Sequence, residues 1–145
     1  MVTVRQILKN KGSQIWATQP DATVYRALQL MAEKGVGALL VLADGKLVGI
    51  FSERDYARKV ILHGKSSVET PVSEIMTPGV ITVKLDQTIG ECMTLMTEKR
   101  FRHLPVVEGD RVVGVISIGD VVKAIISDQE FMIKQLEIYI SGERS

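Results

Sequence analysis

The stretch Gly-Ile-Phe-Ser-Glu-Arg-Asp, residues 49–55, returns 65 residues later as Gly-Val-Ile-Ser-Ile-Gly-Asp, residues 114–120. At the same offset, residues 21–61 align with residues 86–126 without a gap, and 13 of these 41 pairs are identical. Most of the other pairs exchange similar residues. A gapless match of this length indicates an internal duplication.

Each copy shows the same order of predicted elements, β-α-β-β-α. Short apolar segments rich in β-branched residues predict strands, apolar residues three and four apart predict helices, and Gly and Asp residues mark the turns. In the first copy we predict strands over residues 15–18, 38–42 and 46–51, and helices that begin near Asp21 and Asp55. In the second copy we predict strands over residues 80–83, 104–107 and 111–116, and helices that begin near Asp86 and Asp120.

The repeat also predicts how the chain divides. We expect the first copy over residues 1–63, a polar linker over residues 64–71, the second copy over residues 72–127, and a C-terminal helix and tail over residues 128–145. Short helices at residues 4–8 and 73–76 are expected to lead into the first and the second copy. Apolar residues recur at helical spacing in the tail, so this helix needs apolar cover from the core or from a partner subunit.

The composition excludes several classes of function. Of the 145 residues 46% are apolar, and 18 basic residues balance 17 acidic ones, so the surface offers no overall charge for DNA or an anionic membrane. Only 5% are aromatic, which argues against stacking on single-stranded nucleic acid. Cys92 is the only cysteine, so an internal disulfide and a cysteine-rich zinc site are excluded. The N-terminus lacks a signal-peptide pattern, and the longest apolar run, residues 37–43, is too short to span a bilayer, so we expect a cytoplasmic protein with no membrane partner.

With both copies in register, the chain resembles a tandem CBS-domain pair, or Bateman module, of the stand-alone bacterial type. The resemblance rests on the two seven-residue motifs, on Ser73–Thr77 and on Arg102–Val107, and it covers about residues 2–126. It implies an α/β (α+β) fold in which two CBS repeats pack as one module with pseudo-two-fold symmetry, followed by a C-terminal helix. It also implies a homodimer, and a regulatory or signal-transduction role in which clefts between the repeats bind AMP, ADP or ATP, with NAD as a further possible ligand and no catalytic cofactor.

The motif suits a nucleotide chemically. Its Ser opens a helix, where free backbone N–H groups and the hydroxyl can meet a phosphate, and its Asp can accept hydrogen bonds from both hydroxyls of a ribose. The alternative is that Ser52 and Ser117 are only helix N-caps and that Asp55 and Asp120 only favour the helix dipole. The presence of the Ser-x-x-Asp motif in both copies favours contact with a ligand over this alternative. The resemblance adds strand residues that cover the adenine and basic residues near the phosphates, and the candidate ligand-binding residues are Ile15, Trp16, Thr18, Gly37, Ala38, Ile50, Ser52, Arg54, Asp55, Val80, Ile81, Thr82, Arg102, His103, Pro105, Val115, Ser117, Gly119 and Asp120.

The two clefts are expected to differ in charge. Arg102 and His103 open the middle strand of the second copy, where the first copy has Gly37 and Ala38, and Arg54 lies in the first motif only. The alternatives are that the arginines are simply solvated and that His103 is a metal ligand or a catalytic base, although no Asp or His cluster accompanies it. We therefore expect unequal affinities for nucleotide at the two clefts.

Three classes of function remain for the whole chain. We favour a regulatory module that senses an adenine nucleotide, with S-adenosylmethionine as the alternative ligand; the other two classes are a ligand-free structural dimerisation module and an enzyme. The sequence shows no nucleophile–base pair, metal-ligand set, Walker loop or pair of acid/base carboxylates, so we expect no catalytic residue and no metal site. The apolar faces of the helices and of the tail are the expected dimer surface, and the sequence does not identify the regulated protein.

Overall fold

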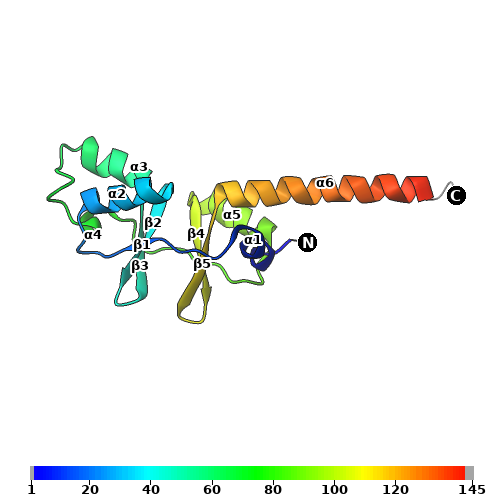
Figure 1. Ribbon diagram of the computed structural model, residues 1–145, viewed down its shortest axis with the longest axis horizontal. Coiled ribbons are helices and arrows are strands. Elements are labelled where there is room, and N and C mark those ends of the chain that lie inside the picture. Colours follow the sequence, from blue (N-terminus) through cyan, green and yellow to red (C-terminus); the bar gives the residue numbers. More distant parts are fainter. Residues whose placement is uncertain (1, 143–145) are drawn as a thin grey trace.

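The computed structural model describes residues 2–142, so residue 1 of the predicted first copy and residues 143–145 of the predicted tail lie outside the described residues. The two copies form two lobes side by side (Figure 1). The N-terminal helix α1 (Val4–Lys11) lies in the second lobe. The first lobe contains β1 (Ala17–Thr18), α2 (Val24–Lys34), β2 (Ala38–Ala43), β3 (Lys46–Ser52), α3 (Glu53–Asp55), the π-helical turn η1 (Tyr56–Ile61) and α4 (Val72–Ile75). The second contains α5 (Ile89–Lys99), β4 (His103–Glu108), β5 (Arg111–Ser117) and α6 (Ile118–Gly142).

The sheets confirm the mixed α/β fold with two repeats. In the first lobe β1 pairs in parallel with β2, and β2 pairs antiparallel with β3. In the second lobe β4 and β5 form the equivalent hairpin, with a register shift at the equivalent place. The turn between β2 and β3 needs left-handed backbone at Asp44 (φ 51°) and Gly45 (φ 80°), which Asp and Gly tolerate best.

The first strand of each repeat is shorter than predicted, and in the second repeat it is only a bridge between Val83 and Val106. In the first repeat the Leu40 N–H donates to the Trp16 carbonyl at 3.1 Å. The position equivalent to Leu40 is Pro105, which has no N–H to donate. The ladder of the second repeat therefore cannot extend toward Ile81.

The short helices α1 and α4 are exchanged between the lobes. Val72 and Ile75 of α4 are buried in the first core, whereas Val4, Ile7 and Leu8 of α1 are buried in the second. The sequence order had predicted that each helix leads into the copy that follows it. Each core therefore contains the short helix that precedes the other repeat in the sequence. As a result, the two repeats cannot separate without opening both cores.

The helices α2 and α5 contribute their apolar faces to the cores, which corrects the expectation that these faces remain for a dimer. Val24 and Met31 of α2 are 0% and 3% exposed, and Ile89 and Met96 of α5 are 7% and 3% exposed. The predicted helix at Asp120 and the predicted C-terminal helix are one continuous helix, α6, which extends far beyond the second lobe (Figure 1). No helix within residues 2–142 is long and apolar enough to cross a membrane.

Candidate functional site

Two hollows lie where the repeats meet, and Gly37, Ile50 and His103 line both. The first cleft, of about 450 Å³, is lined by Gly37, Ile50, Ser52, Glu53, Arg54, Asp55, Arg58, Thr77, Val80, Arg100, Phe101, Arg102 and His103. The second cleft, of about 400 Å³, is lined by Lys11, Gly12, Gln14, Trp16, Lys34, Val36, Gly37, Ala38, Leu39, Leu40, Ile50, His103, Val115 and Ser117. Both volumes fall in the range of small-molecule sites.

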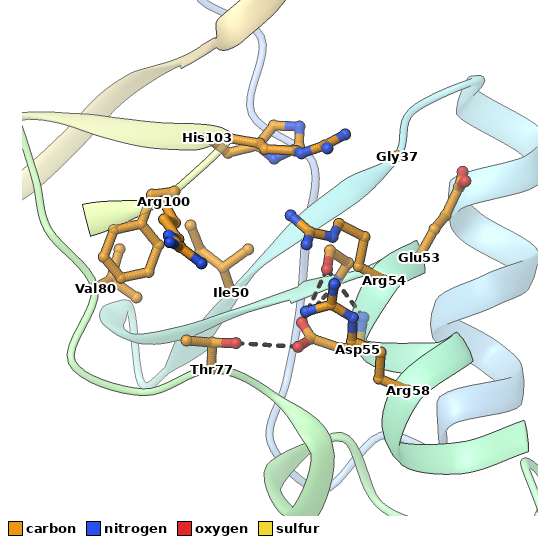
Figure 2. A pocket seen from close by; sticks show the side chains of 13 residues that line it. Gly37, Ile50, Glu53, Arg54, Asp55, Arg58, Thr77, Val80, Arg100 and His103 are labelled. Carbon is orange, nitrogen blue, oxygen red and sulfur yellow. Dashed lines mark hydrogen bonds between the residues drawn. The ribbon is translucent and has the colours of Figure 1, made fainter. Parts of the chain in front are cut away.

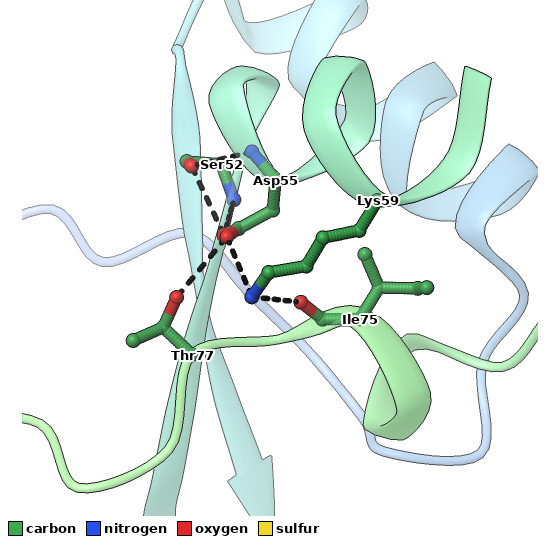
Figure 3. Close-up of polar contacts among 5 residues, drawn as sticks. All are labelled: Ser52, Asp55, Lys59, Ile75 and Thr77. Carbon is green, nitrogen blue, oxygen red and sulfur yellow. Dashed lines mark hydrogen bonds and ion pairs between the residues drawn. The ribbon is translucent and has the colours of Figure 1, made fainter. Parts of the chain in front are cut away.

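In the first cleft, the Asp55 carboxylate accepts from four donors (Figure 3). Its Oδ2 accepts from the backbone N–H and the hydroxyl of Ser52, each at 3.0 Å. Its Oδ1 accepts from the Thr77 hydroxyl at 3.1 Å and pairs with Lys59 Nζ at 3.2 Å. Lys59 in turn donates to the carbonyl of Ile75 in α4. A carboxylate has about four acceptor positions, so a ribose would have to replace donors already there, and the two hydroxyls are the natural ones to exchange.

The equivalent carboxylate, Asp120, is held differently. Its Oδ2 accepts from the Ser117 backbone N–H at 2.8 Å and from Lys11 Nζ at 2.7 Å, and Lys11 also donates to the Val115 carbonyl at 3.0 Å. Burial by itself would raise the pKa of Asp120, but the hydrogen bonds from Lys11 and Ser117 outweigh it, so the pKa lies below its usual value. No hydrogen bond from within residues 2–142 reaches the Asp120 Oδ1, which leaves that oxygen open to another donor.

The first cleft collects positive charge from both repeats (Figure 2). Arg54 and Arg58 come from the helical segment after β3, and Arg100 and Arg102 flank Phe101 just before β4. Repulsion by Arg58 and then by Arg102 lowers the pKa of Arg54, as expected for like charges that face a common space. The arrangement can hold an anion that carries more than one negative charge.

Two further features of this cleft bear on binding. Burial lowers the pKa of His103, and the charges of Lys11 and Arg102 add to the effect while that of Asp120 opposes it, so the neutral imidazole, which can both donate and accept, is favoured. Arg100 ends α5 in the left-handed conformation with φ of 59°, whereas the first repeat has Gly35 at the equivalent place with φ of 65°. Left-handed backbone is uncommon at a residue other than glycine, and here it ends α5 at the wall of the cleft.

The second cleft has no arginine. Trp16, the only tryptophan, lies half-buried in its wall with Lys34 Nζ 4.6 Å from the ring centroid. Gly37 and Ala38 occupy the positions that Arg102 and His103 hold in the other repeat. The two clefts therefore differ in their basic residues: Arg54 and Arg102 line only the first cleft, Lys11 and Lys34 line only the second, and His103 lines both. Unequal affinities for nucleotide stay a prediction.

Most of the predicted site residues line one of the clefts, but seven do not. Thr18 and Thr82 line shallow surface grooves near the hairpin ends, and Ile81 packs against the second core. Asp120 lines a third hollow between α1 and α6, beside Lys11, which reaches both that hollow and the second cleft. The seven residues outside both clefts are Ile15, Thr18, Ile81, Thr82, Pro105, Gly119 and Asp120. Their contact with a ligand stays a prediction.

Sequence reasoning missed several residues of the clefts. Thr77 belongs to the quoted stretch 73–77, which is the one signal that could have identified it. Lys11 lies far from the second motif in sequence, and only the exchange of α1 brings it to Asp120. The residues added by the structure are Glu53, Arg58, Thr77, Arg100 and Phe101 in the first cleft, and Lys11, Gly12, Gln14, Lys34, Val36, Leu39 and Leu40 in the second.

A search for metal sites within residues 2–142 finds no group of three or more His, Cys, Asp or Glu side chains that could hold an ion. Cys92 is buried, and burial raises the pKa of its thiol to about 11, so it is a poor nucleophile.

Comparison with known proteins gives consistent matches over nearly the whole chain. The CBS-domain family profile matches residues 13–62 and 72–127. The mitochondrial CBS domain-containing protein CBSX3 of Arabidopsis thaliana is 41% identical over 97% of this chain and 72% of its own length. The CBS domain-containing protein YhcV of Bacillus subtilis is 31% identical over 74% of this chain and 76% of its own. The solved structure of a protein with CBS domains from Burkholderia ambifaria is 53% identical, covers 88% of this chain and 96% of that one, and superposes with a TM-score of 0.85.

Proposed function

The chain belongs to the CBS-domain family, and from that premise we propose that it is a regulatory module whose two clefts bind adenine nucleotides without catalysis. The observation that carries the proposal is the first cleft, which places the Ser52–Asp55 pair in one hollow with four arginines and His103. A carboxylate for ribose hydroxyls and guanidinium groups for phosphates are the two recognition elements that a nucleotide needs.

At the first cleft the ribose is proposed to exchange places with two hydroxyls of the protein. Ser52 and Thr77 release Asp55 by rotating their side chains, and the 2′ and 3′ hydroxyls of the nucleotide take over the two hydrogen bonds. The exchange keeps the carboxylate satisfied, so the net gain per bond is small, about 1 kcal/mol. Ile50 and Val80 supply apolar wall for the adenine, and the arginines supply most of the remaining affinity. We therefore assign the first cleft to ADP or ATP.

The second cleft is proposed to bind fewer phosphates. Asp120 lies outside this cleft, in the hollow between α1 and α6 that shares Lys11 with it, and we propose that a ribose at this end of the cleft reaches the open Oδ1. The half-buried Trp16 of the cleft wall offers an indole face. Only Lys11 and Lys34 are available as cations, and both already have partners. AMP or the adenosine part of NAD suits this cleft better than ATP. S-adenosylmethionine, which carries no phosphate, would favour the second cleft over the first.

As a signalling device, the module is proposed to act as a homodimer whose two lobes shift when nucleotide binds between them. Because α1 and α4 are exchanged, a change at one cleft acts on both cores. The ligand can favour one arrangement only to the extent that it binds that arrangement more tightly. A partner protein would then recognise the altered dimer.

Calorimetric titration of adenosine, AMP, ADP and ATP tests the binding proposal. Asp55→Asn and Asp120→Asn preserve shape and remove one negative charge each, and loss of a charged hydrogen-bonding partner should weaken binding by about 1.5–3 kcal/mol, or roughly ten- to a hundredfold. Because the Asp55 carboxylate already accepts from four donors, the loss of affinity in Asp55→Asn is expected near the lower end of this range. The loss in Asp120→Asn is expected near the upper end. Asp44→Asn is the matched control, since it lies in a hairpin turn outside both clefts and Asn also tolerates its φ of 51°. If both cleft variants bind every compound as the wild type does, the proposal is wrong and a ligand-free dimerisation module becomes the better account.

A further inference from the structure

We propose that the distal part of α6 is a self-association surface that pairs with α6 of a second copy of this chain. The surface is the α6 stripe, which consists of Met132, Ile133, Leu136, Tyr139 and Ile140. The proposal adds to the homodimer put forward above by placing its interface on one helix. It does not depend on nucleotide binding.

The first turns of α6 belong to the second lobe, and the rest of the helix stands free of it. Val121 is fully buried, and Ala124 and Ile125 pack against the second core. From residue 129 to residue 142 every side chain is exposed, and the helix projects away from both lobes (Figure 1). A free helix of about this length is marginal in water, because most helical stability comes from packing of an apolar face. The distal helix therefore needs a partner for that face.

The α6 stripe has the geometry of a helix that packs along another helix. Met132, Leu136 and Tyr139 follow at intervals of four and three, and Ile133 and Ile140 are seven apart beside them. This alternation of three and four is the spacing of a coiled-coil seam. The same spacing runs back through Gln129 to Ile125, which packs against the second core, so the stripe continues a face that α6 already uses on its own lobe.

The exposed apolar area is concentrated here and is large enough for a dimer. The five stripe residues are 54–64% exposed, and Phe131 and Ile138, on another side of the same helix, are 61% and 56% exposed. Elsewhere in the described chain the large exposed apolar side chains are Tyr25, Ile61, Leu62 and Val68 in the first repeat and the linker after it, and Ile118, Val122 and Ile126 in the proximal part of α6. A standard interface buries roughly 800 Å² per partner, and the five stripe residues supply a large part of it together with the helix surface between them.

A second copy is the occupant that fits this surface best. The stripe carries no charge, so its partner must be an apolar face of similar length, and an identical helix related by a two-fold axis provides one and closes the assembly. The polar side of the distal helix carries Glu130 and Glu137 against Lys134. Helices that lie on membranes carry mostly Lys and Arg on the polar side, so this charge argues against a lipid surface.

Sedimentation equilibrium and light scattering of the full chain test the proposal. The wild type is expected as a dimer of two 16.0 kDa chains. Leu136→Glu should raise the dimer dissociation constant at least a hundredfold and leave a monomer. Leu136→Ala, which keeps a strong helix former in place, should weaken the dimer about tenfold. The matched control is Lys134→Glu, on the opposite side of the same helix, and it should remain dimeric.

Each other outcome overturns the assignment. A monomeric wild type, or a Leu136→Glu variant that stays as dimeric as the control, would place any interface away from α6. Co-sedimentation of the wild type with phosphatidylserine vesicles that is lost in Leu136→Glu would assign the stripe to a membrane instead. Because Leu136 lines neither cleft, the calorimetric titrations on the same variants report nucleotide binding separately, so either proposal can fail while the other stands.

Discussion

Arg100 should reveal a conflict between stability and ligand binding. Its backbone is left-handed at the end of α5, where the first repeat uses Gly35. A residue other than glycine pays about 1–2 kcal/mol in this conformation, and glycine loses about 0.5–1 kcal/mol more entropy on folding. Arg100→Gly is therefore expected to raise the free energy of unfolding by about 0.5–1 kcal/mol, which for a chain of this size raises the Tm by roughly 2 °C.

The same substitution removes one guanidinium from the first cleft. Arg100 is exposed, so screening by water limits its pairing with a phosphate to about 0.2–1 kcal/mol, or roughly 1.4- to 5-fold in affinity. ATP should bind more weakly by about that factor, and adenosine, which has no phosphate, should bind as before. Arg100→Lys is the control, because it keeps both the charge and the left-handed strain and should change neither the Tm nor adenosine binding.

Thermal unfolding and calorimetric titration at low salt, on the same preparations, measure both effects. A lower Tm for Arg100→Gly would refute the strain argument. An equal loss of affinity for ATP and adenosine, or none for ATP, would refute the role of Arg100 in phosphate binding.

Two further predictions concern the exchanged helix α1. A Cβ at Gly114 would lie 2.8 Å from the methyl groups of Leu8, so Gly114→Ala should lower the free energy of unfolding by about 1–3 kcal/mol. The control Gly90→Ala, on the exposed side of α5, should raise the free energy of unfolding slightly. Equal effects of the two substitutions in urea unfolding would count against the close packing of Gly114 on Leu8. The folded pKa of Asp120 is depressed, so its pairing with Lys11 stabilises the fold above the unfolded pKa of about 3.9 and is lost as the pH falls through the folded value. Lys11→Met should therefore be about 0.5–1 kcal/mol less stable than the wild type at pH 7 and equally stable near pH 2, and a difference that persists in acid would contradict this origin.

The two-repeat α/β fold could be predicted from the sequence because the signals for it lie within short segments and occur once in each copy. The Ser-x-x-Asp motif and the alternation of short strands and helices recur at a fixed offset, and each copy supports the reading of the other. The shortened strand at residues 80–83 was also foreseeable in principle, because Pro105 stands where Leu40 donates a hydrogen bond. The single continuous α6 was not, since apolar spacing alone does not show whether two helical segments join.

The candidate site could be predicted only where its residues lie in the motifs. Ser52, Asp55 and Arg54 follow from the repeat, and the structure places all three in the first cleft. Lys11 could not be assigned, because its position depends on the exchange of α1 between lobes, which is a matter of tertiary packing. Arg100 gave no sequence signal either, since its left-handed backbone appears only in the structure.

A crystal structure of the protein grown with a saturating concentration of ATP would test the central claim most directly. The account predicts nucleotide density in the first cleft, with the ribose hydroxyls on the Asp55 carboxylate in place of the Ser52 and Thr77 hydroxyls. It also predicts the phosphates against Arg54 and Arg102. Density for ATP elsewhere on the surface, or an empty first cleft with the four donors still on Asp55, would contradict it.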